Sequence, residues 1–417
     1  MALLGMSGAA LGEHAGKTRL LHEPLRNPSS VGGIYLLADD FHGEAAIILD
    51  QVSNVTLRNF TIRGNRARLS QPQDLPAYDQ TFASRFRANG VLLRGGSGIR
   101  VEDAHFEAIA GFAVLASGTQ RVSIARISVS DSGSLKPNGR NNTTGGVLIE
   151  DGSCDWTVED SRFTSIRGNA IWTHSRYTAP RNERGIIRRN TFQEIGRDAV
   201  QVGHAVAVQV EANSGVRIGY PVEVVDMEGG GTPVGIDTAG NVEGSAYVSN
   251  EFRDINGKCI DLDGFHHGVV SGNRCLNNGA EAPYGHFGIV MNNTNPDMQS
   301  VSIVIRDNLI EGTKYGGIFV IGSGHVIEGN VLRSMQSTRC SDPEVVSGCS
   351  FFADEPELLR TGIYLGQRAE RPAVTRGNRI IDNEISGWRM DHACVGFAPQ
   401  VVRAENTIRG NRCRHEP

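Results

Sequence analysis

The chain has 417 residues, 51 of them glycine, and a formal net charge of −5. This charge balance gives no electrostatic footprint for a nucleic-acid partner. No stretch approaches the roughly 18 consecutive apolar residues that cross a membrane as a helix. Glycine makes up about 12% of the chain against a usual value of roughly 7%, without a collagen period, which predicts many turns and short strands.

The N-terminal residues 1–8 are apolar but lack the basic region of an export signal. These residues fit the middle of a β-coil better than a signal peptide. We therefore expect an export signal and the first coils to precede the printed sequence, and the protein to be secreted or periplasmic.

A short motif recurs along the chain, with a small residue, an apolar residue, a variable residue and a second apolar residue. Its shortest separations are 23 and 24 residues, from Gly90 to Ala113 and from Gly235 to Cys259. The copies begin at Gly90, Ala113, Gly146, Ala170, Ala199, Gly235, Cys259, Gly288, Gly317 and Gly362. Each copy reads as a short strand of period two.

A second apolar motif alternates with the first, as in 55–62, 187–192, 304–310 and 326–332. Gly-Asn-Arg recurs from Gly64, Gly272, Gly377 and Gly410. Asn tolerates the left-handed backbone of a tight corner, and stacked Asn side chains can bond along a solenoid axis. The pattern predicts one all-β domain over 1–417, a parallel β-helix of roughly ten to twelve coils. Inserted loops are expected at about 66–88, 214–234 and 334–361.

This repeat resembles the right-handed parallel β-helix of the pectin-lyase-like superfamily, from about Ile34 to Cys413. The resemblance implies carbohydrate chemistry, since similar members include polysaccharide lyases, glycoside hydrolases, sugar epimerases and tailspike depolymerases. The catalytic Asn-Thr-Asp, Asp-Asp and Gly-His-Gly set of polygalacturonases is not found in order. Residues 263–267, Asp-Gly-Phe-His-His, are a distant echo of the Asp-Pro-His-Asp signature of alginate epimerases.

Strand alternation places the third and fifth positions of each repeat on the outer face. Asp237 and Asp261 share the third position 24 residues apart, so they should stack on neighbouring coils ~4.8 Å apart. Asp263 faces the same side two residues further along. Crowded carboxylates raise one another's pKa, which is the arrangement that an acid/base pair needs. We expect Asp237 and Asp261 to be catalytic, with Asp263 and His266 assisting; the alternative is solvated surface carboxylates.

Groups that suit sugar recognition surround these carboxylates. Aromatic faces stack on pyranose rings, while amides and imidazoles bind hydroxyls. The expected substrate-binding residues are Trp172, His174, Gln201, His267, Tyr284, His286, Asn292 and Asn293. Trp172 packing beneath an inserted loop is the alternative at that position. From the Gly146 copy to the Gly362 copy, the third and fifth positions of the repeats carry no Lys or Arg. This favours a neutral polysaccharide over a uronate polymer. Asp198 lies at a turn, where it is expected to bond backbone amides.

No metal is assigned. Calcium held by Asp237, Asp261 and Asp263 is a minor alternative, and zinc held by His266, His267 and an Asp matches no recognised spacing. Seven cysteines suggest local pairs 259/275, 340/349 and 394/413, with Cys154 left over; buried reduced cysteines are the alternative.

The sequence thus predicts a glycoside hydrolase that cleaves a polysaccharide or oligosaccharide by two-carboxylate catalysis. A lyase or epimerase acting on a uronate polymer is the second hypothesis, with His266, Tyr284 or His286 abstracting the proton. A non-catalytic glycan-binding or surface β-helix is the third, and it predicts dispersed carboxylates.

Overall fold

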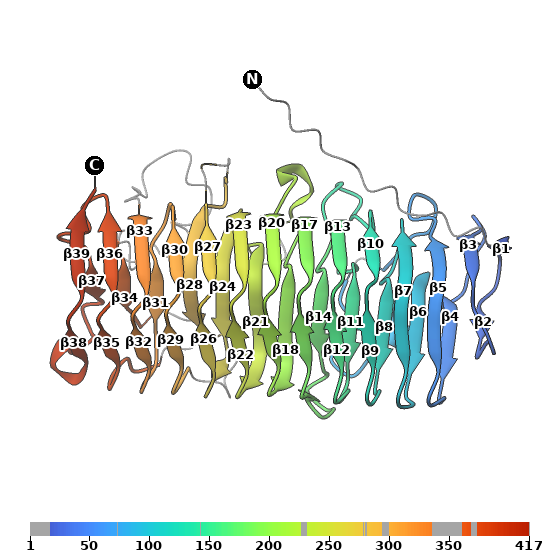
Figure 1. Ribbon diagram of the computed structural model, residues 1–417, viewed down its shortest axis with the longest axis horizontal. Coiled ribbons are helices and arrows are strands. Elements are labelled where there is room, and N and C mark those ends of the chain that lie inside the picture. Colours follow the sequence, from blue (N-terminus) through green and yellow to red (C-terminus); the bar gives the residue numbers. More distant parts are fainter. Residues whose placement is uncertain are drawn as a thin grey trace, which may run out of the picture.

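The computed structural model describes residues 17–416, except 73, 142, 227–231, 278, 280–281, 294–299, 336–360 and 368–372. The described strands stack into an elongated solenoid, with the N-terminal strands at one end and the C-terminal strands at the other (Figure 1). Every registered strand pair is parallel, as the repeat predicts. No helix among these residues is long and apolar enough to cross a membrane.

One sheet, here called sheet B, receives one strand from each coil. Its main path is β2 (Leu25–Arg26), β4 (Ala45–Asp50), β6 (Asn89–Arg94), β8 (Val114–Ser117), β11 (Val147–Glu150), β14 (Ile171–His174), β18 (Val200–Val206), β21 (Val234–Glu243), β24 (Gly257–Asp263), β28 (His286–Asn292), β31 (Ile318–Val320), β34 (Ile363–Leu365) and β37 (Val395–Phe397). Two short strands, β15 (Asn182–Glu183) and β25 (Phe265–His266), pair beside it. The described part of the chain therefore has thirteen coils, one more than the largest number expected.

The other sheet, sheet A, begins with β1 (Thr18–Leu21), β3 (Gly33–Leu37), β5 (Thr56–Arg63) and β7 (Arg100–Glu107). Because β7 pairs with both β9 and β10, sheet A then divides into two ladders. The first is β9 (Ser123–Ala125), β12 (Thr157–Glu159), β16 (Ile186–Arg188), β19 (Gln209–Glu211), β22 (Ala246–Val248), β26 (Val269–Ser271), β29 (Val304–Arg306), β32 (Val326–Glu328), β35 (Arg379–Ile381) and β38 (Thr407–Arg409). The second is β10 (Ser128–Ser130), β13 (Arg162–Ile166), β17 (Thr191–Ile195), β20 (Ser214–Ile218), β23 (Glu251–Ile255), β27 (Arg274–Leu276), β30 (Leu309–Glu311), β33 (Val331–Met335), β36 (Glu384–Gly387) and β39 (Arg412–His415).

The interior is an apolar column built from the positions that the repeat assigned to it. Val200 pairs with Ile236, and Ile236 pairs with Ile260, so β-branched side chains stack coil upon coil. All three are fully buried. Burying a side chain of this size stabilises the fold by about 1.5–3 kcal/mol.

Asparagines form a second column at one corner of the solenoid, buried except for the partly exposed last member, Asn411. Each amide nitrogen donates to the carboxamide oxygen of the next coil at 2.9–3.0 Å. The members are Asn190, Asn213, Asn250, Asn273, Asn308, Asn330, Asn383 and Asn411. The predicted axial stacking of Asn is therefore confirmed, and it satisfies backbone groups that the corner would otherwise leave unpaired.

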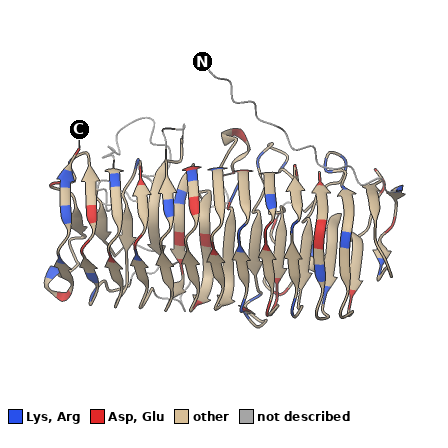
Figure 2. Ribbon diagram, in the orientation of Figure 1, with Lys and Arg blue, Asp and Glu red and all other residues tan. Residues whose placement is uncertain are grey.

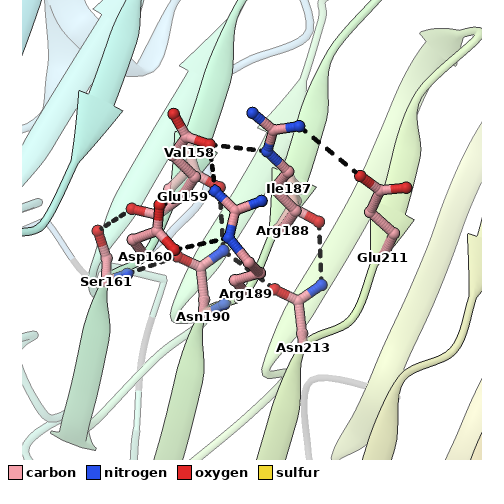
Figure 3. Close-up of polar contacts among 10 residues, drawn as sticks. All are labelled: Val158, Glu159, Asp160, Ser161, Ile187, Arg188, Arg189, Asn190, Glu211 and Asn213. Atoms are coloured by element: carbon pink, nitrogen blue, oxygen red, sulfur yellow. Dashed lines mark hydrogen bonds and ion pairs between the residues drawn. The ribbon is translucent and has the colours of Figure 1, made fainter.

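Ion pairs between coils cross the adjoining outer surface. Arg188 bonds Glu159 at 2.7 Å and lies 4.0 Å from Glu211, while Arg189 bonds Asp160 at 2.7 Å (Figure 3). Basic and acidic residues are interspersed along the solenoid in Figure 2. Exposed pairs of this kind contribute at most about 1 kcal/mol each.

Two of the predicted insertions are resolved in part. The loop at 66–88 includes one short helix, α1 (Phe82–Arg85). The loop expected at 214–234 begins instead as strand β20, so the irregular segment starts after Ile218 and includes the 3-10 turn η1 (Val222–Val224). Most of 334–361 lies outside the described residues. A second 3-10 turn, η3 (Arg403–Glu405), precedes β38.

Two of the three predicted disulfides are present, Cys259–Cys275 and Cys394–Cys413, and Cys154 is free. Cys340 and Cys349 lie outside the described residues.

Candidate active site

Two of the predicted catalytic carboxylates lie side by side on the outer face of sheet B. Ile236 pairs with Ile260, so Asp237 on β21 and Asp261 on β24 follow in register on adjacent strands. Gln201 on β18 pairs directly with Asp237. The three strands are neighbours near the middle of the solenoid (Figure 1). The register that the sequence predicted for these strands is confirmed. The polar side chains on the outer face of β18, β21 and β24 are called the strip below.

Asp237 is the end of a chain of amide contacts. The Gln201 side-chain nitrogen donates to Asp237 Oδ2 at 2.6 Å, and Asn169 donates to Gln201 Oε1 at 2.7 Å. The Asn169 carboxamide oxygen in turn accepts the backbone N–H of Asp198 at 3.1 Å. Because each amide is fixed at both ends, Gln201 presents its N–H groups and not its oxygen to Asp237.

The electrostatics of the strip favour the neutral form of Asp237. Burial, together with the neighbouring carboxyls of Asp198 and Asp261, raises the pKa of Asp237 well above its usual range. Burial likewise raises the pKa of Asp198 to about 7, although Arg197 lies 3.7 Å away. Three carboxyls crowded into one partly dry strip cannot all ionise, because each charge opposes the next.

Asp261 has a different partner, which the sequence analysis missed. Lys258, on the same strand, forms a close ion pair with Asp261 Oδ2. The side chain of Asp261 is 8% exposed and that of Lys258 is 19% exposed. Although burial lowers the pKa of Lys258, the charge of Asp261 outweighs this effect, and the pKa lies above its usual value. The expectation of a strip without lysine is therefore wrong.

One register position explains why Lys258 and Asp198 were missed. Val234 pairs with Lys258, and the backbone N–H of Val234 donates to Asp198 Oδ1 at 3.0 Å. Each of these residues directly precedes the small residue that opens a repeat, a position that the sequence analysis did not align. Asp198 does bond a backbone amide, as predicted for a turn, and it also contributes to the charge of the strip.

The remaining predicted residues are distributed over the strip and its surroundings. Asp263 follows Asp261 on β24 and pairs with Asn292, so both continue the strip. His266 lies instead on β25, opposite Glu243 at the far end of β21, and His267 follows it at the corner. Tyr284 is buried just before β28, where its backbone N–H donates to Asn256.

Three of the predicted binding residues have structural surroundings. Trp172 is 6% exposed because Phe82 of α1 packs on it, with ring centroids 4.9 Å apart. This is the loop-packing alternative, and it replaces the open aromatic platform. His174 lies in the same aromatic group, and burial lowers its pKa to about 4. Asn293 is fully buried and accepts hydrogen bonds from Ser300.

His286 is buried at the start of β28, opposite Gly257. Burial lowers its pKa to about 4, so the imidazole is neutral near neutral pH. The ring is therefore compatible with a base in its charge state, and with 5% exposure it is about as buried as Asp261 at 6%.

The polar strip ends on both sides in apolar surroundings. On the N-terminal side, Leu115, Leu148 and Trp172 pack under α1. On the C-terminal side, the outer positions of β28 and β31 are Val290 and Phe319, both buried. The polar groups of β18, β21 and β24 thus form a limited window and not a continuous charged face.

Breaking the Lys258–Asp261 pair should be costly. We expect Lys258→Met to leave an unpaired buried carboxylate and to lower the free energy of unfolding by about 3–5 kcal/mol. Adding Asp261→Leu to that variant should restore most of the loss, because neither charge then remains buried. Denaturant unfolding measures both, with the exposed Lys17→Met as control. A shift for Lys258→Met no larger than the control's would contradict the buried pair.

Comparisons with known proteins agree with this architecture. Residues 45–234 match the family model described as "Right handed beta helix region". The sequence matches no curated protein. The chain is a right-handed parallel β-helix.

Among solved structures, the Dettilon tailspike protein aligns with a TM-score of 0.55 and 14% identity, over 88% of this chain and 61% of the tailspike chain. A mannuronic acid-specific polysaccharide lyase of family 6 from human gut microbiota aligns with a TM-score of 0.49 and 12% identity, over 93% and 77% of the two chains. The GH136 lacto-N-biosidase from Eubacterium ramulus aligns with a TM-score of 0.46 and 15% identity, over 78% and 61%. The chain thus spans less than two thirds of the tailspike, and the likeness to the tailspike concerns the fold alone.

Proposed function

We propose that this protein is a glycoside hydrolase that cleaves a polysaccharide or oligosaccharide at the Asp237–Asp261 pair. The observation that carries the proposal is the difference between the two carboxyl environments. Asp237 has a raised pKa and accepts an amide hydrogen bond, while Asp261 is ion-paired with Lys258. One neutral and one ionised carboxyl, side by side, are the two groups that glycoside hydrolysis needs.

In this mechanism Asp237 is the general acid. Its proton passes to the glycosidic oxygen as the bond between that oxygen and the anomeric carbon breaks. Asp261 attacks the anomeric carbon, and water then cleaves the resulting ester and returns a proton to Asp237. Retaining enzymes hold the two carboxyl groups ~5–5.5 Å apart, and inverting ones hold them ~6.5–9.5 Å apart to admit a water. We propose retention because Asp237 and Asp261 lie on directly adjacent strands.

A lyase or epimerase is the second candidate, because Lys258 and Arg197 lie beside the carboxyls and could bind an acidic sugar. Proton abstraction by Lys258 would need its unprotonated amine, however. Asp261 holds the pKa of Lys258 above its usual value, so the lysine is cationic in the resting protein. This charge state argues against Lys258 as the base of an elimination. A non-catalytic β-helix would scatter its carboxylates, and the shared face of Asp237 and Asp261 supports catalysis instead.

The proposal is tested by incubating the protein with a panel of neutral and acidic polysaccharides. We expect new reducing ends from at least one of them, without ultraviolet absorbance from unsaturated sugars. Unsaturated products would establish elimination. No cleavage of any member by folded protein would favour a binding protein.

The pH dependence of kcat/KM should report the pKa of the general acid, Asp237. Because the pKa of Asp237 is raised well above the ordinary aspartate range, the proton needed for catalysis stays bound to higher pH than on an ordinary aspartate. We expect kcat/KM to fall as pH rises through that pKa, since the free enzyme then loses its acid. In Asp237→Glu the alkaline limb should move, whereas a profile unchanged in that variant would assign the limb to another group.

The proposed setting is extracellular. Two disulfides, Cys259–Cys275 and Cys394–Cys413, suit an oxidising compartment. Calcium at the strip stays a prediction from the sequence; Lys258 already supplies a positive charge beside Asp261.

A further inference from the structure

A group of potential metal ligands lies at the corner of sheet B, outside the carboxyl strip. Glu243 ends β21 and pairs with His266 on β25, and His267 directly follows. One ligand atom from each of the three residues lies within 4.8 Å of the other two. The rings of His266 and His267 are 5.4 Å apart between centroids and inclined by 75°. Side chains from two neighbouring coils thus converge on one point.

A backbone hydrogen bond orients the imidazole ring of His266. Its Nδ1 lies 3.1 Å from the carbonyl oxygen of Gly264, and a carbonyl can only accept a hydrogen bond. Nδ1 therefore carries a proton, and Nε2 is the ring nitrogen that faces Glu243, 4.0 Å from its Oε2. Metal-binding histidines are typically oriented in this way, with the second ring N–H donated to a backbone carbonyl or a carboxylate.

Glu243 is itself held in place. Arg181 donates to Glu243 Oε2 at 2.9 Å and to Asn241 Oδ1 at 2.7 Å. A carboxylate has two oxygens, so Arg181 can keep one while the other binds a cation. Ligating carboxylates commonly carry such an outer hydrogen bond. The ordinary alternative is a surface ion pair between Arg181 and Glu243 with two histidines nearby.

We propose that Glu243, His266 and His267 form a binding site for a divalent transition metal, with Zn²⁺ as the probe. Two imidazoles and a carboxylate are the donor set that Zn²⁺ accepts in sites with three protein ligands, which leave a position for water or a further ligand. The half-exposed Glu243 and the exposed His267 need only side-chain rotation to close on the ion. The site is six residues along β21 from Asp237, at most ~20 Å away, and does not depend on the proposed hydrolysis.

The test is Zn²⁺ titration of untagged protein by calorimetry, with thermal unfolding measured in parallel. We expect one Zn²⁺ per chain and a rise in Tm with Zn²⁺, because the ion binds only the folded corner. Affinity should fall at least about 10-fold in both His266→Gln and His267→Gln. His392→Gln, which changes an exposed histidine elsewhere, is the matched control and should bind like the wild type.

Because His267 is exposed, His267→Gln should fold like the wild type. Circular dichroism checks the fold of both histidine variants. The proposal is overturned if the wild type binds no Zn²⁺, if both variants bind like the control, or if only one of the two loses affinity.

Discussion

Replacing Asp237 by Asn should lower kcat/KM by about 10²–10⁴-fold, the range that a general acid supplies. The substitution preserves shape and leaves an oxygen to accept the amide of Gln201, but it removes the transferable proton. Because Asn keeps the volume of Asp237 and its hydrogen bond from Gln201, and adds no charge to the strip, we expect little change in Tm. Initial rates on the polysaccharide that the panel identifies measure the effect.

Asp307→Asn is the matched control, since Asp307 is an exposed carboxylate at a turn of sheet A. It should keep wild-type activity. An Asp237→Asn variant that retained half of the wild-type rate would remove Asp237 from the mechanism. Asp261→Asn is a less clean test, because it also leaves the buried Lys258 without its partner and should lower stability.

Asn273→Ala should destabilise the fold by roughly 2–6 kcal/mol, at about 1–3 kcal/mol for each buried group left without a partner. The Asn273 oxygen accepts from the backbone and side-chain nitrogens of Asn250, and its amide donates to Tyr247 and Asn308. Alanine removes all four contacts and orphans the Asn250 N–H and the Tyr247 carbonyl. Denaturant unfolding measures the loss.

An exposed asparagine provides the comparison for that variant. Asn138 accepts only the backbone N–H of Arg140 on the surface, so Asn138→Ala should change stability little. Equal shifts for the two variants would mean that the asparagine column does not hold the coils together.

The strands and their register could be predicted because a solenoid repeats one environment. Ile236 and Ile260 meet the same apolar interior, so the sequence shows the same residue type at the same step. That alternation fixes which face Asp237 and Asp261 occupy. The stacked asparagines follow from the same periodicity at the corner.

The parts that were missed depend on contacts that no period records. Phe82 reaches Trp172 across a long insertion, so the covered platform could not be read from the strand pattern. Lys258 precedes the aligned residues and reaches Asp261, which lies three residues further along the same strand. Glu243 meets His266 only because β21 continues well past the four-residue motif that defined it.

The most direct test of the carboxyl-pair account is the mass of the products released from a cleaved polysaccharide. Hydrolysis by Asp237 and Asp261 adds one water for every bond broken, whereas elimination adds none. The account predicts product masses that sum to the substrate plus water, with Asp237→Asn protein releasing almost none of them. Products whose masses sum to the substrate alone, with a double bond at the new non-reducing end, would contradict it.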